Sequence, residues 1–271
     1  EMSASLVGSE MCIRDRLKDK TVFWIALILL LQPYEWGRAI YAMINPDYVV
    51  STGHFMPYAM RAQEATANGN FFEVLCSNIS DGQLYSNIWQ VENGRLFQTA
   101  ALFMFGMLLG RRKYLIKSEE SVRFWKKMLK GAVLAFIPLY CLKTFVPDLL
   151  TNPSVQIPYK IAVPSYANFA FMIILVSIFT LLWFKKEKGY GWQSLLIPYG
   201  RMSLTNYISQ SIMGVIIYYG FGLAMYKYAG ATASLLIALL IFTVQLIFSR
   251  WWLARHKQGP LEFLWRKGTW I

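Results

Sequence analysis

The sequence is poor in charged residues and in cysteine for a chain of 271 residues. Only 15% of its residues are charged, against roughly 25% in a typical soluble domain, and 56% are hydrophobic. A soluble globular protein of this size cannot hide so much apolar surface in one core, and a disordered chain requires low hydrophobicity. Three cysteines cannot form a disulfide framework. Once these classes of protein are excluded, the class that remains is a polytopic membrane protein.

Familiar catalytic and metal-binding motifs are missing as well. The chain has no GxSxG, no Walker A, no HExxH and no GxGxxG opening a helix. Neither His54 nor His256 lies at metal-ligand spacing from another His, Cys or carboxylate, so we expect no metal and no cofactor. His54 is conceivable as a general base, because imidazole changes charge near neutral pH. Cys76 and Cys141 either approach each other on the outer side or, as we prefer, are free buried thiols.

Residues 1–16, EMSASLVGSEMCIRDR, lack the apolar periodicity of the rest and do not form a signal peptide. They resemble read-through peptides translated from adapter DNA at the ends of environmental sequence fragments. We expect a non-native segment here, with a short native cytoplasmic tail as the alternative. In the first case Cys12 is not native and the natural protein extends further. Residues 17–271 are expected to form a single helical membrane domain.

Six stretches approach the roughly 20 apolar residues that a membrane helix needs. The first opens with TVFWIALILLLQ and is expected to kink near Pro33. The tail GPLEFLWRKGTWI places Pro260 at a helix start, followed by apolar side chains suited to the membrane interface. The predicted fold is all-α, a polytopic helical membrane protein with about six transmembrane helices and an amphipathic C-terminal helix. The expected spans are about 20–44, 91–110, 132–146, 163–184, 202–225 and 231–253.

The basic residues are distributed unevenly between the two sides that these spans would separate. The chain has 27 Lys and Arg against 15 acidic residues, a net charge of +12 that would suggest nucleic acid in a soluble protein. Most of them fall in segments that alternation puts on one side, namely 17–20, 111–130, 185–201 and 250–271. The positive-inside rule makes both ends cytoplasmic. We therefore expect anionic lipid headgroups at the cytoplasmic face as partners, and no nucleic acid.

The fifth expected span carries polar residues on one helical face. Ser203, Asn206 and Gln210 share this face, and Gln245 with Ser249 forms a smaller stripe on the sixth span. Two interpretations are open, namely hydrogen bonding between neighbouring helices or the lining of a cavity. Gln245 and Ser249 are plausible partners in either case.

Two further polar groups lie beside the Pro33 kink within the first span and at the outer end of the second span. Glu35 and Arg38, three residues apart, are either an internal ion pair or a substrate-facing pair beside a broken helix. Glu92, Arg95 and Gln98 mark the second span, and Arg95 and Gln98 face one way. They either line a cavity mouth or let Arg95 reach the outer headgroups.

The C-terminal seventy residues resemble a known family. GRMSLTNY, a Gly-aromatic-Gly-Leu turn and a closing GPLEFLWR are similar to the C-terminal region of YeiB-like bacterial inner-membrane proteins, domain of unknown function 418. Agreement is looser over residues 20–195. The motif residues are Gly200, Arg201, Leu204, Thr205, Asn206, Tyr207, Gly259, Pro260, Glu262, Trp265 and Arg266.

The resemblance implies location more clearly than activity. It places the chain in the bacterial cytoplasmic membrane, and family members begin with further spans, so the chain looks like an N-terminally truncated fragment. The family has been guessed to act in transport, and its architecture is distantly similar to membrane acyltransferases that use a histidine base. Arg201 either anchors the span or holds a lipid phosphate or an acidic donor.

Three functional hypotheses remain, and they differ in what they expect of the polar residues. We place transport of a small polar solute slightly first, because no histidine lies within a span. A membrane-embedded acyl or other group transferase, with Arg201, Ser203, Asn206 and Gln210 lining a cavity, is the second hypothesis. A non-catalytic structural membrane protein is the third, and whether the chain is an enzyme stays open.

Overall fold

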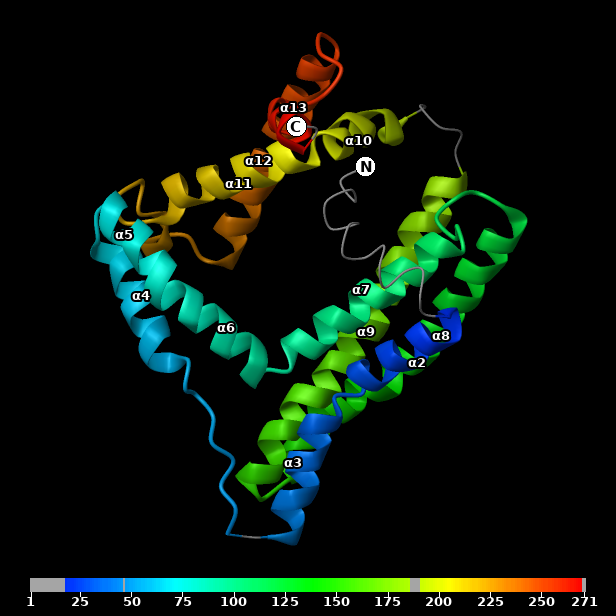
Figure 1. The fold of residues 1–271 in the computed structure, drawn as a ribbon, viewed down its shortest axis with the longest axis vertical. Coiled ribbons are helices and arrows are strands. Elements are labelled where there is room, and N and C mark those ends of the chain that lie inside the picture. Colours follow the sequence, from blue (N-terminus) through cyan, green and yellow to red (C-terminus); the bar gives the residue numbers. More distant parts are fainter. Residues whose placement is uncertain (1–17, 46, 186–190, 270–271) are drawn as a thin grey trace. The chain divides into compact units, whose positions relative to one another are not determined.

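The computed structural model describes residues 18–45, 47–185 and 191–269, so the expectation for residues 1–16 lies outside the described part. The described residues are helical, and none of them forms a strand (Figure 1). They divide into two compact units. The all-helical prediction is confirmed for this part of the chain. The prediction of one domain over 17–271 stays a prediction.

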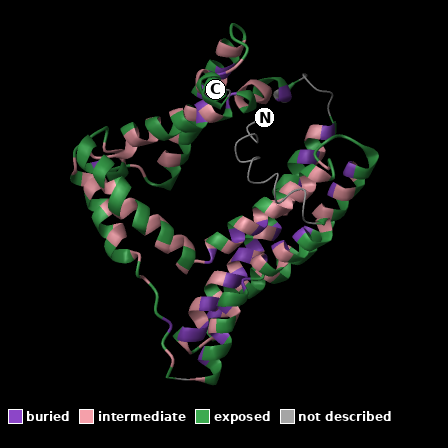
Figure 2. Ribbon diagram, in the orientation of Figure 1, coloured by how far each residue is buried: buried purple, intermediate pink, exposed green. Residues whose placement is uncertain are grey.

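The first unit comprises residues up to His54 and Ser86–Lys185. Within it α8 packs along α9, α2 packs on α7 and α3 packs on α9. Small side chains on α9, among them Ala162, Ala167 and Ala170, are buried and let the neighbouring helices approach (Figure 2). Its helices are α2 (Asp19–Leu30), α3 (Pro33–Ile44), α7 (Arg95–Arg111), α8 (Glu119–Phe145) and α9 (Pro153–Lys185), with a 3₁₀ turn η2 (Pro147–Leu149).

The second unit comprises Phe55–Tyr85 and the residues after Lys185. Arg61 donates to Asp81 at 2.8 Å and ties α4 to the π-helical turn η1, and this hydrogen bond raises the pKa of Arg61. Helix α6 (Gln83–Glu92) begins in this unit and continues into the first. The other elements are α4 (Met56–Asn68), α5 (Phe71–Ser77), η1 (Asn78–Gly82), α10 (Trp192–Arg201), α11 (Ser203–Tyr218), η3 (Met225–Lys227), α12 (Ala231–Leu253) and α13 (Pro260–Thr269).

Three stretches of the described residues are long and apolar enough to cross a membrane, namely Glu119–Leu149, Pro153–Lys185 and Ala231–Leu253. They contain the third, fourth and sixth expected spans. Large apolar side chains on α12, such as Leu236 and Leu240, are exposed, as lipid-facing side chains would be. By length and composition, these helices suggest a membrane protein.

The first and second expected spans have different helix bounds from those predicted. The first divides into α2 and α3 because Pro33 has no N–H and restricts the residue before it, and Gln32 adopts a left-handed φ of 49°. The second begins at Arg95 instead of 91, because Gly94, with φ 62°, separates α6 from α7. Neither α2, α3 nor α7 reaches 18 residues.

The fifth expected span is shorter than predicted. Helix α11 ends at Tyr218 rather than 225, and the Gly-aromatic-Gly turn begins there. The Gly220 N–H donates to Thr66 O at 2.9 Å, and the Leu223 N–H donates to Ile216 O at 2.8 Å. A Cβ at Gly220 would overlap a backbone carbonyl, so glycine is required at this approach.

Cys76 and Cys141 are both free and both exposed. The expectation of buried thiols was therefore wrong for both. Cys76 lies on α5, where only Val74 is buried, and Cys141 lies on the exposed side of α8.

Candidate functional site

The two halves of the C-terminal motif meet where α13 begins beside the first turn of α11. Glu262 accepts a hydrogen bond from the Thr205 N–H at 3.0 Å and a second from the Thr205 hydroxyl. The Leu261 N–H in turn donates to Thr205 Oγ1 at 3.2 Å. A carboxylate is favourable at a helix N-terminus, where backbone N–H groups lack partners within the helix. A Cβ at Gly259 would overlap the Glu262 carboxylate, which explains glycine at this position.

Asn206 is the buried centre of a second set of hydrogen bonds. Its side-chain amide donates to Tyr199 O and to Ser249 Oγ, each at 3.0 Å. Gln245 donates to Asn206 O at 2.8 Å and to Ser209 Oγ at 2.9 Å. The structure thus brings Asn206, Gln245 and Ser249 together. These bonds join α10, α11 and α12, so the polar groups are used in helix packing.

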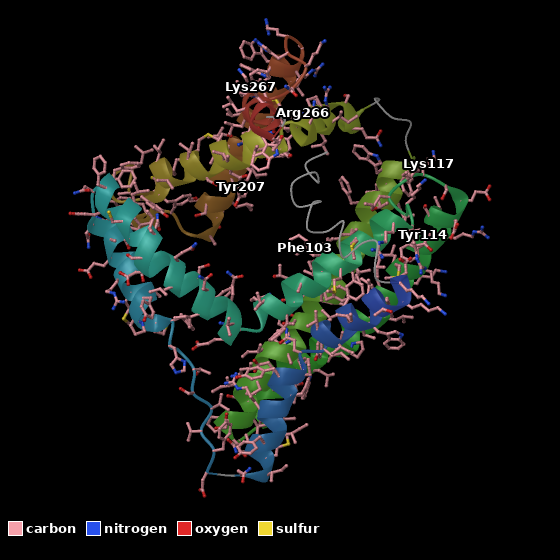
Figure 3. The ribbon with its side chains drawn as sticks, viewed as in Figure 1. Phe103, Tyr114, Lys117, Tyr207, Arg266 and Lys267 are labelled. Carbon is pink, nitrogen blue, oxygen red and sulfur yellow. The ribbon has the colours of Figure 1, made fainter. Side chains whose placement is uncertain are left out.

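Other residues of the expected polar face lie elsewhere. Ser203 and Gln210 are exposed, because α11 packs through Thr205 and Asn206. Arg201 donates to Lys257 O at 2.9 Å and is exposed. The remaining motif residues include exposed Tyr207 and Arg266, labelled in Figure 3, together with exposed Gly200 and Trp265, half-buried Pro260 and half-buried Leu204.

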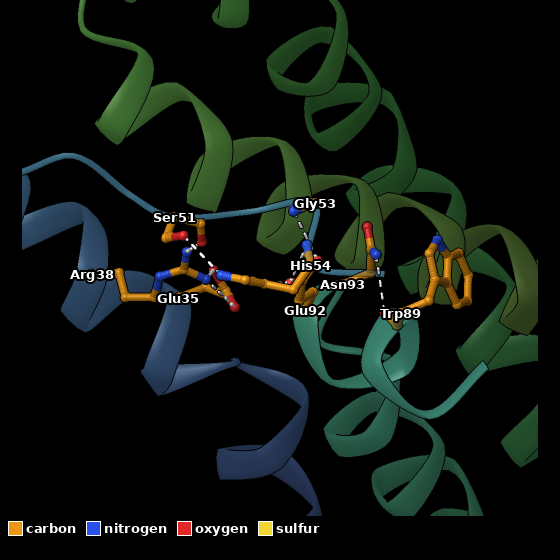
Figure 4. A network of polar contacts seen from close by, with 8 residues as sticks. All are labelled: Glu35, Arg38, Ser51, Gly53, His54, Trp89, Glu92 and Asn93. Atoms are coloured by element: carbon orange, nitrogen blue, oxygen red, sulfur yellow. Dashed lines mark hydrogen bonds and ion pairs between the residues drawn. The ribbon is translucent and has the colours of Figure 1, made fainter. Parts of the chain in front are cut away.

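The first unit contains the other candidate residues. Glu35 is 1% exposed and accepts from Arg38 Nη1 at 3.2 Å, so the two side chains form an ion pair. Arg38 also reaches the backbone oxygen of Ser51 at 3.4 Å (Figure 4). Helix α3 therefore holds the loop at 47–55 next to a positive charge.

That loop carries a serine and a histidine, and the histidine contacts a carboxylate at the end of α6. Ser51 Oγ lies 2.9 Å from His54 Nε2, and His54 Nδ1 hydrogen-bonds Glu92 Oε1 (Figure 4). Glu92 also accepts from the Gly53 and His54 N–H groups, each at 3.0 Å. A carboxylate only accepts, so a neutral imidazole carries its proton on Nδ1 and accepts from the Ser51 hydroxyl through Nε2. This is the order of contacts in a nucleophile–base–carboxylate triad.

The ends of α6 and of the loop fix this arrangement. Glu92 is the last residue of α6, and the Asn93 side chain donates to Trp89 O at 2.9 Å, which closes the final turn. The His54 side chain is 61% exposed, whereas that of Glu92 is 14% exposed. The carboxylate is thus held in place while the imidazole and Ser51 face outward.

A buried polar cluster lies at the break between α2 and α3. Gln32 is fully buried and donates to Ser165 Oγ at 3.0 Å, while its Oε1 has no hydrogen-bond partner in the described part of the chain. A Cβ at Gly94 would lie 2.5 Å from that oxygen. On α7, Arg95 Nη1 donates to Gln98 Oε1 at 2.8 Å, a hydrogen bond that neither the cavity-mouth nor the headgroup interpretation had included.

Sequence reasoning did not identify Ser51 or Glu92 as partners of His54. Ser51 and His54 are three residues apart in a loop, which is a weak local signal. Glu92 is 38 residues further along, and no periodicity connects it to the loop. Gln32 also went unnoticed, although its place directly before Pro33 was a usable signal for unusual backbone.

Three curated relatives match short parts of the chain. The uncharacterized protein YxaH of Bacillus subtilis is 42% identical over 72 residues, which is 27% of this chain and 18% of that protein. An uncharacterized 39.9 kDa protein of Bacillus acidopullulyticus is 45% identical over 76 residues, 28% of this chain and 21% of that protein. The uncharacterized protein YeiB of Escherichia coli is 36% identical over 70 residues, 26% of this chain and 18% of that protein.

The chain thus matches about a fifth of the length of these relatives. No solved structure matches it. The family model described as "Protein of unknown function (DUF418)" matches residues 109–271, more than half of the chain, and includes both halves of the C-terminal motif. The resemblance seen in the motifs is confirmed, and the chain belongs to the DUF418 family of YeiB-like proteins.

Proposed function

We propose that the protein is an integral protein of the bacterial cytoplasmic membrane with six spans and both ends cytoplasmic. The sorting of Lys and Arg along the chain and the three long apolar helices support this. Helices α7 and α11, and the broken pair α2 and α3, complete the six spans. The loop at 47–55 then lies on the outer side.

The activity that the geometry favours is acyl transfer at this outer loop. The observation that carries it is the series Ser51–His54–Glu92. In this proposal Ser51 is the nucleophile, His54 the general base and Glu92 the group that orients the imidazole. Arg38 supplies a positive charge beside Ser51, where negative charge develops during attack on a carbonyl.

The reaction proceeds in two steps. The Ser51 hydroxyl attacks the carbonyl carbon of an ester or thioester, its proton passes to His54 Nε2, and the leaving group departs with that proton. A hydroxyl group of an envelope glycan or lipid then attacks the carbonyl carbon of the acyl-serine and gives its proton to His54, which passes it to Ser51 Oγ as the bond between the acyl group and Ser51 breaks. The ester bond broken on the enzyme is replaced by one on the acceptor.

An alkyl fluorophosphonate tests this directly, because it labels serines activated by a base. Membranes from cells that express the full chain are treated, and labelled peptides are identified by mass spectrometry. We expect label on Ser51 that disappears in Ser51→Ala and forms about 100-fold more slowly in His54→Gln, the lower range of general-base effects. Ser80, an exposed serine bonded to Cys76 O, is the control, and Ser80→Ala should label normally.

Two results would contradict the transferase proposal. One is an unlabelled Ser51 in folded protein, and the other is labelling that His54→Gln leaves unchanged. Mass spectrometry of envelope glycans and lipids supplies the second readout. Cells that carry Ser51→Ala should lose an acyl group that cells with the wild-type protein or Ser80→Ala retain.

Transport of a small polar solute is the second candidate. The fully buried Gln32 lies at a helix break, and its Oε1 has no hydrogen-bond partner among the residues that the structure describes. This favours transport, since broken helices in membranes line substrate paths. Profiles of small metabolites in the medium of growing cells test it. Gln32→Leu should then change the level of a solute without a covalent change in the envelope, and identical profiles would refute it.

A further inference from the structure

An apolar pocket of about 840 Å³ lies within the first unit, between α2, α7, α8 and α9. Phe23, Leu27 and Leu30 line it from α2, and Phe105 faces them from α7. Its volume lies within the range of ligand pockets, and helices in close contact leave no such space because their side chains interdigitate. The pocket is separate from Ser51, His54 and Glu92, none of which lines it.

Gly106 leaves space on the α7 wall of the pocket. A Cβ built at Gly106, or at Gly110 one turn later, would meet no atom within 4 Å. Neither glycine therefore packs closely against a neighbouring helix in the described part of the chain. Gly106 lines the pocket, and Gly110 does not.

One end of the pocket is basic. Lys20 and Arg112 line it there together with Asp19. Asp19 pairs with Arg111 at 3.0 Å and Arg112 at 3.4 Å. Because Lys20 follows Asp19 in the chain and also lines the pocket, cations outnumber this carboxylate and the local charge is positive. Hydrogen bonds to Tyr114 and Asp19 raise the pKa of Arg112, which stays charged.

Aromatic residues flank this basic end. Tyr114 stacks on Phe124 at a centroid distance of 4.1 Å, and Trp125 donates to Tyr114 O at 2.8 Å. Tyr114 and Lys117 mark the segment between α7 and α8 in Figure 3. Basic residues beside Tyr and Trp are typical of a membrane–water interface.

The length of the pocket fits one leaflet. Its α2 wall runs from Lys20 to Leu30, and the ten steps between these residues rise about 15 Å at 1.5 Å per step. Half of a hydrocarbon core of about 30 Å has the same depth. A molecule with an anionic head at Lys20 and a hydrocarbon chain that reaches Leu30 therefore matches the pocket in charge and in length.

We propose that this pocket binds an anionic diacyl phospholipid, with the phosphate at Lys20 and Arg112 and one acyl chain along α2 and α7. Basic pockets between membrane helices are known to bind anionic headgroups. The assignment of this lipid to the cytoplasmic leaflet rests on the proposed topology. The binding site itself does not, and its test is independent of the topology and of the triad.

Native mass spectrometry of the full chain in detergent tests the site. The protein is titrated with dioleoyl-phosphatidylglycerol and with dioleoyl-phosphatidylcholine, which has the same chains and a zwitterionic head. We expect one retained lipid and about tenfold or stronger preference for the glycerol lipid, because two cations contact the headgroup. Equal binding of the two lipids, or no retained lipid, would overturn the proposal.

Two pairs of variants distinguish the part of the pocket that binds the acyl chain from the part that binds the phosphate headgroup. Gly106→Phe fills the pocket and should abolish the retained adduct, whereas Gly110→Phe, on the same helix outside the pocket, should preserve it. Lys20→Gln with Arg112→Gln should keep lipid binding but lose most of the preference between headgroups, and Lys227→Gln in the other unit should not change it. Thermal unfolding confirms that each variant is folded. Retention of full preference in the double variant would also contradict the proposal.

Discussion

At the scale of single residues, the C-terminal motif is explained by hydrogen bonds that its members make with each other. Glu262 joins the start of α13 to Thr205 at the start of α11, and Gly259 leaves room for the carboxylate. Asn206 likewise joins α11 to α12 through its hydrogen bonds with Ser249 and Gln245. None of these contacts requires a substrate.

Glu262→Ala should lower the free energy of unfolding by about 1–3 kcal/mol, because the Thr205 N–H and hydroxyl lose their acceptor. Gly259→Ala should act in the same direction, since its methyl group displaces the carboxylate. Thermal unfolding in detergent measures both effects. Glu64→Ala, an exposed glutamate of the same unit, is the matched control, and an equal loss there would argue against a specific role for Glu262.

Asn206→Ala should destabilise the protein by roughly 1 kcal/mol, a common value for interhelical hydrogen bonds in membranes. Gln210→Ala, one turn later on the same helix, should change stability little because Gln210 is exposed. Unfolding curves of the two variants under identical conditions make the comparison. If Gln210→Ala costs as much as Asn206→Ala, the packing role assigned to Asn206 is wrong.

At the scale of elements, the sequence predicted regular helices better than interrupted ones. The expected span 231–253 coincides with α12, since an uninterrupted apolar run follows Gly230. The expected span 163–184 lies inside the longer α9, which begins at Pro153 because Pro158 and Pro164 are accommodated within the helix. The positions of breaks, as at Gln32 and Gly94, depend on contacts between distant segments, which hydropathy does not contain.

Gly94→Ala should destabilise the first unit by about 1–2 kcal/mol, because a left-handed backbone is unfavourable for alanine and the new methyl group meets Gln32. Gly110→Ala on the same helix should be neutral or slightly stabilising, since alanine is the better helix former. Chemical denaturation in detergent compares the pair. Indistinguishable stabilities would contradict the contact between Gly94 and Gln32.

The candidate site residues, like the helix breaks, could be predicted from the sequence only where local spacing determines the contact. The pairs Glu35–Arg38 and Arg95–Gln98 were predictable because helical spacing puts their members on one face. The series Ser51–His54–Glu92 was not, because Glu92 reaches the loop only through the fold. Local spacing therefore predicts pairs within one helix and gives no information about partners on different segments.

At the scale of the whole molecule, we propose that the net charge of +12 sets the orientation of the chain in the membrane. In the proposed six-span topology the basic segments lie on one side, where we propose that they contact anionic lipid, and two of their residues, Lys20 and Arg112, line one end of the pocket between α2 and α7. The loop with Ser51 and His54 belongs to the other side. The placement of the activity on the outer side and of the lipid in the cytoplasmic leaflet both rest on this topology, whereas the triad, the lipid-binding site and their tests do not.

Cysteine accessibility in intact cells tests this topology most directly. The native cysteines of the full chain are replaced by serine, and Thr52→Cys, beside the triad, or Lys117→Cys, beside the pocket, is introduced; both positions are exposed. A membrane-impermeant maleimide should label position 52 in intact cells and position 117 only after permeabilisation. Labelling of position 117 in intact cells, or protection of position 52, would contradict the account.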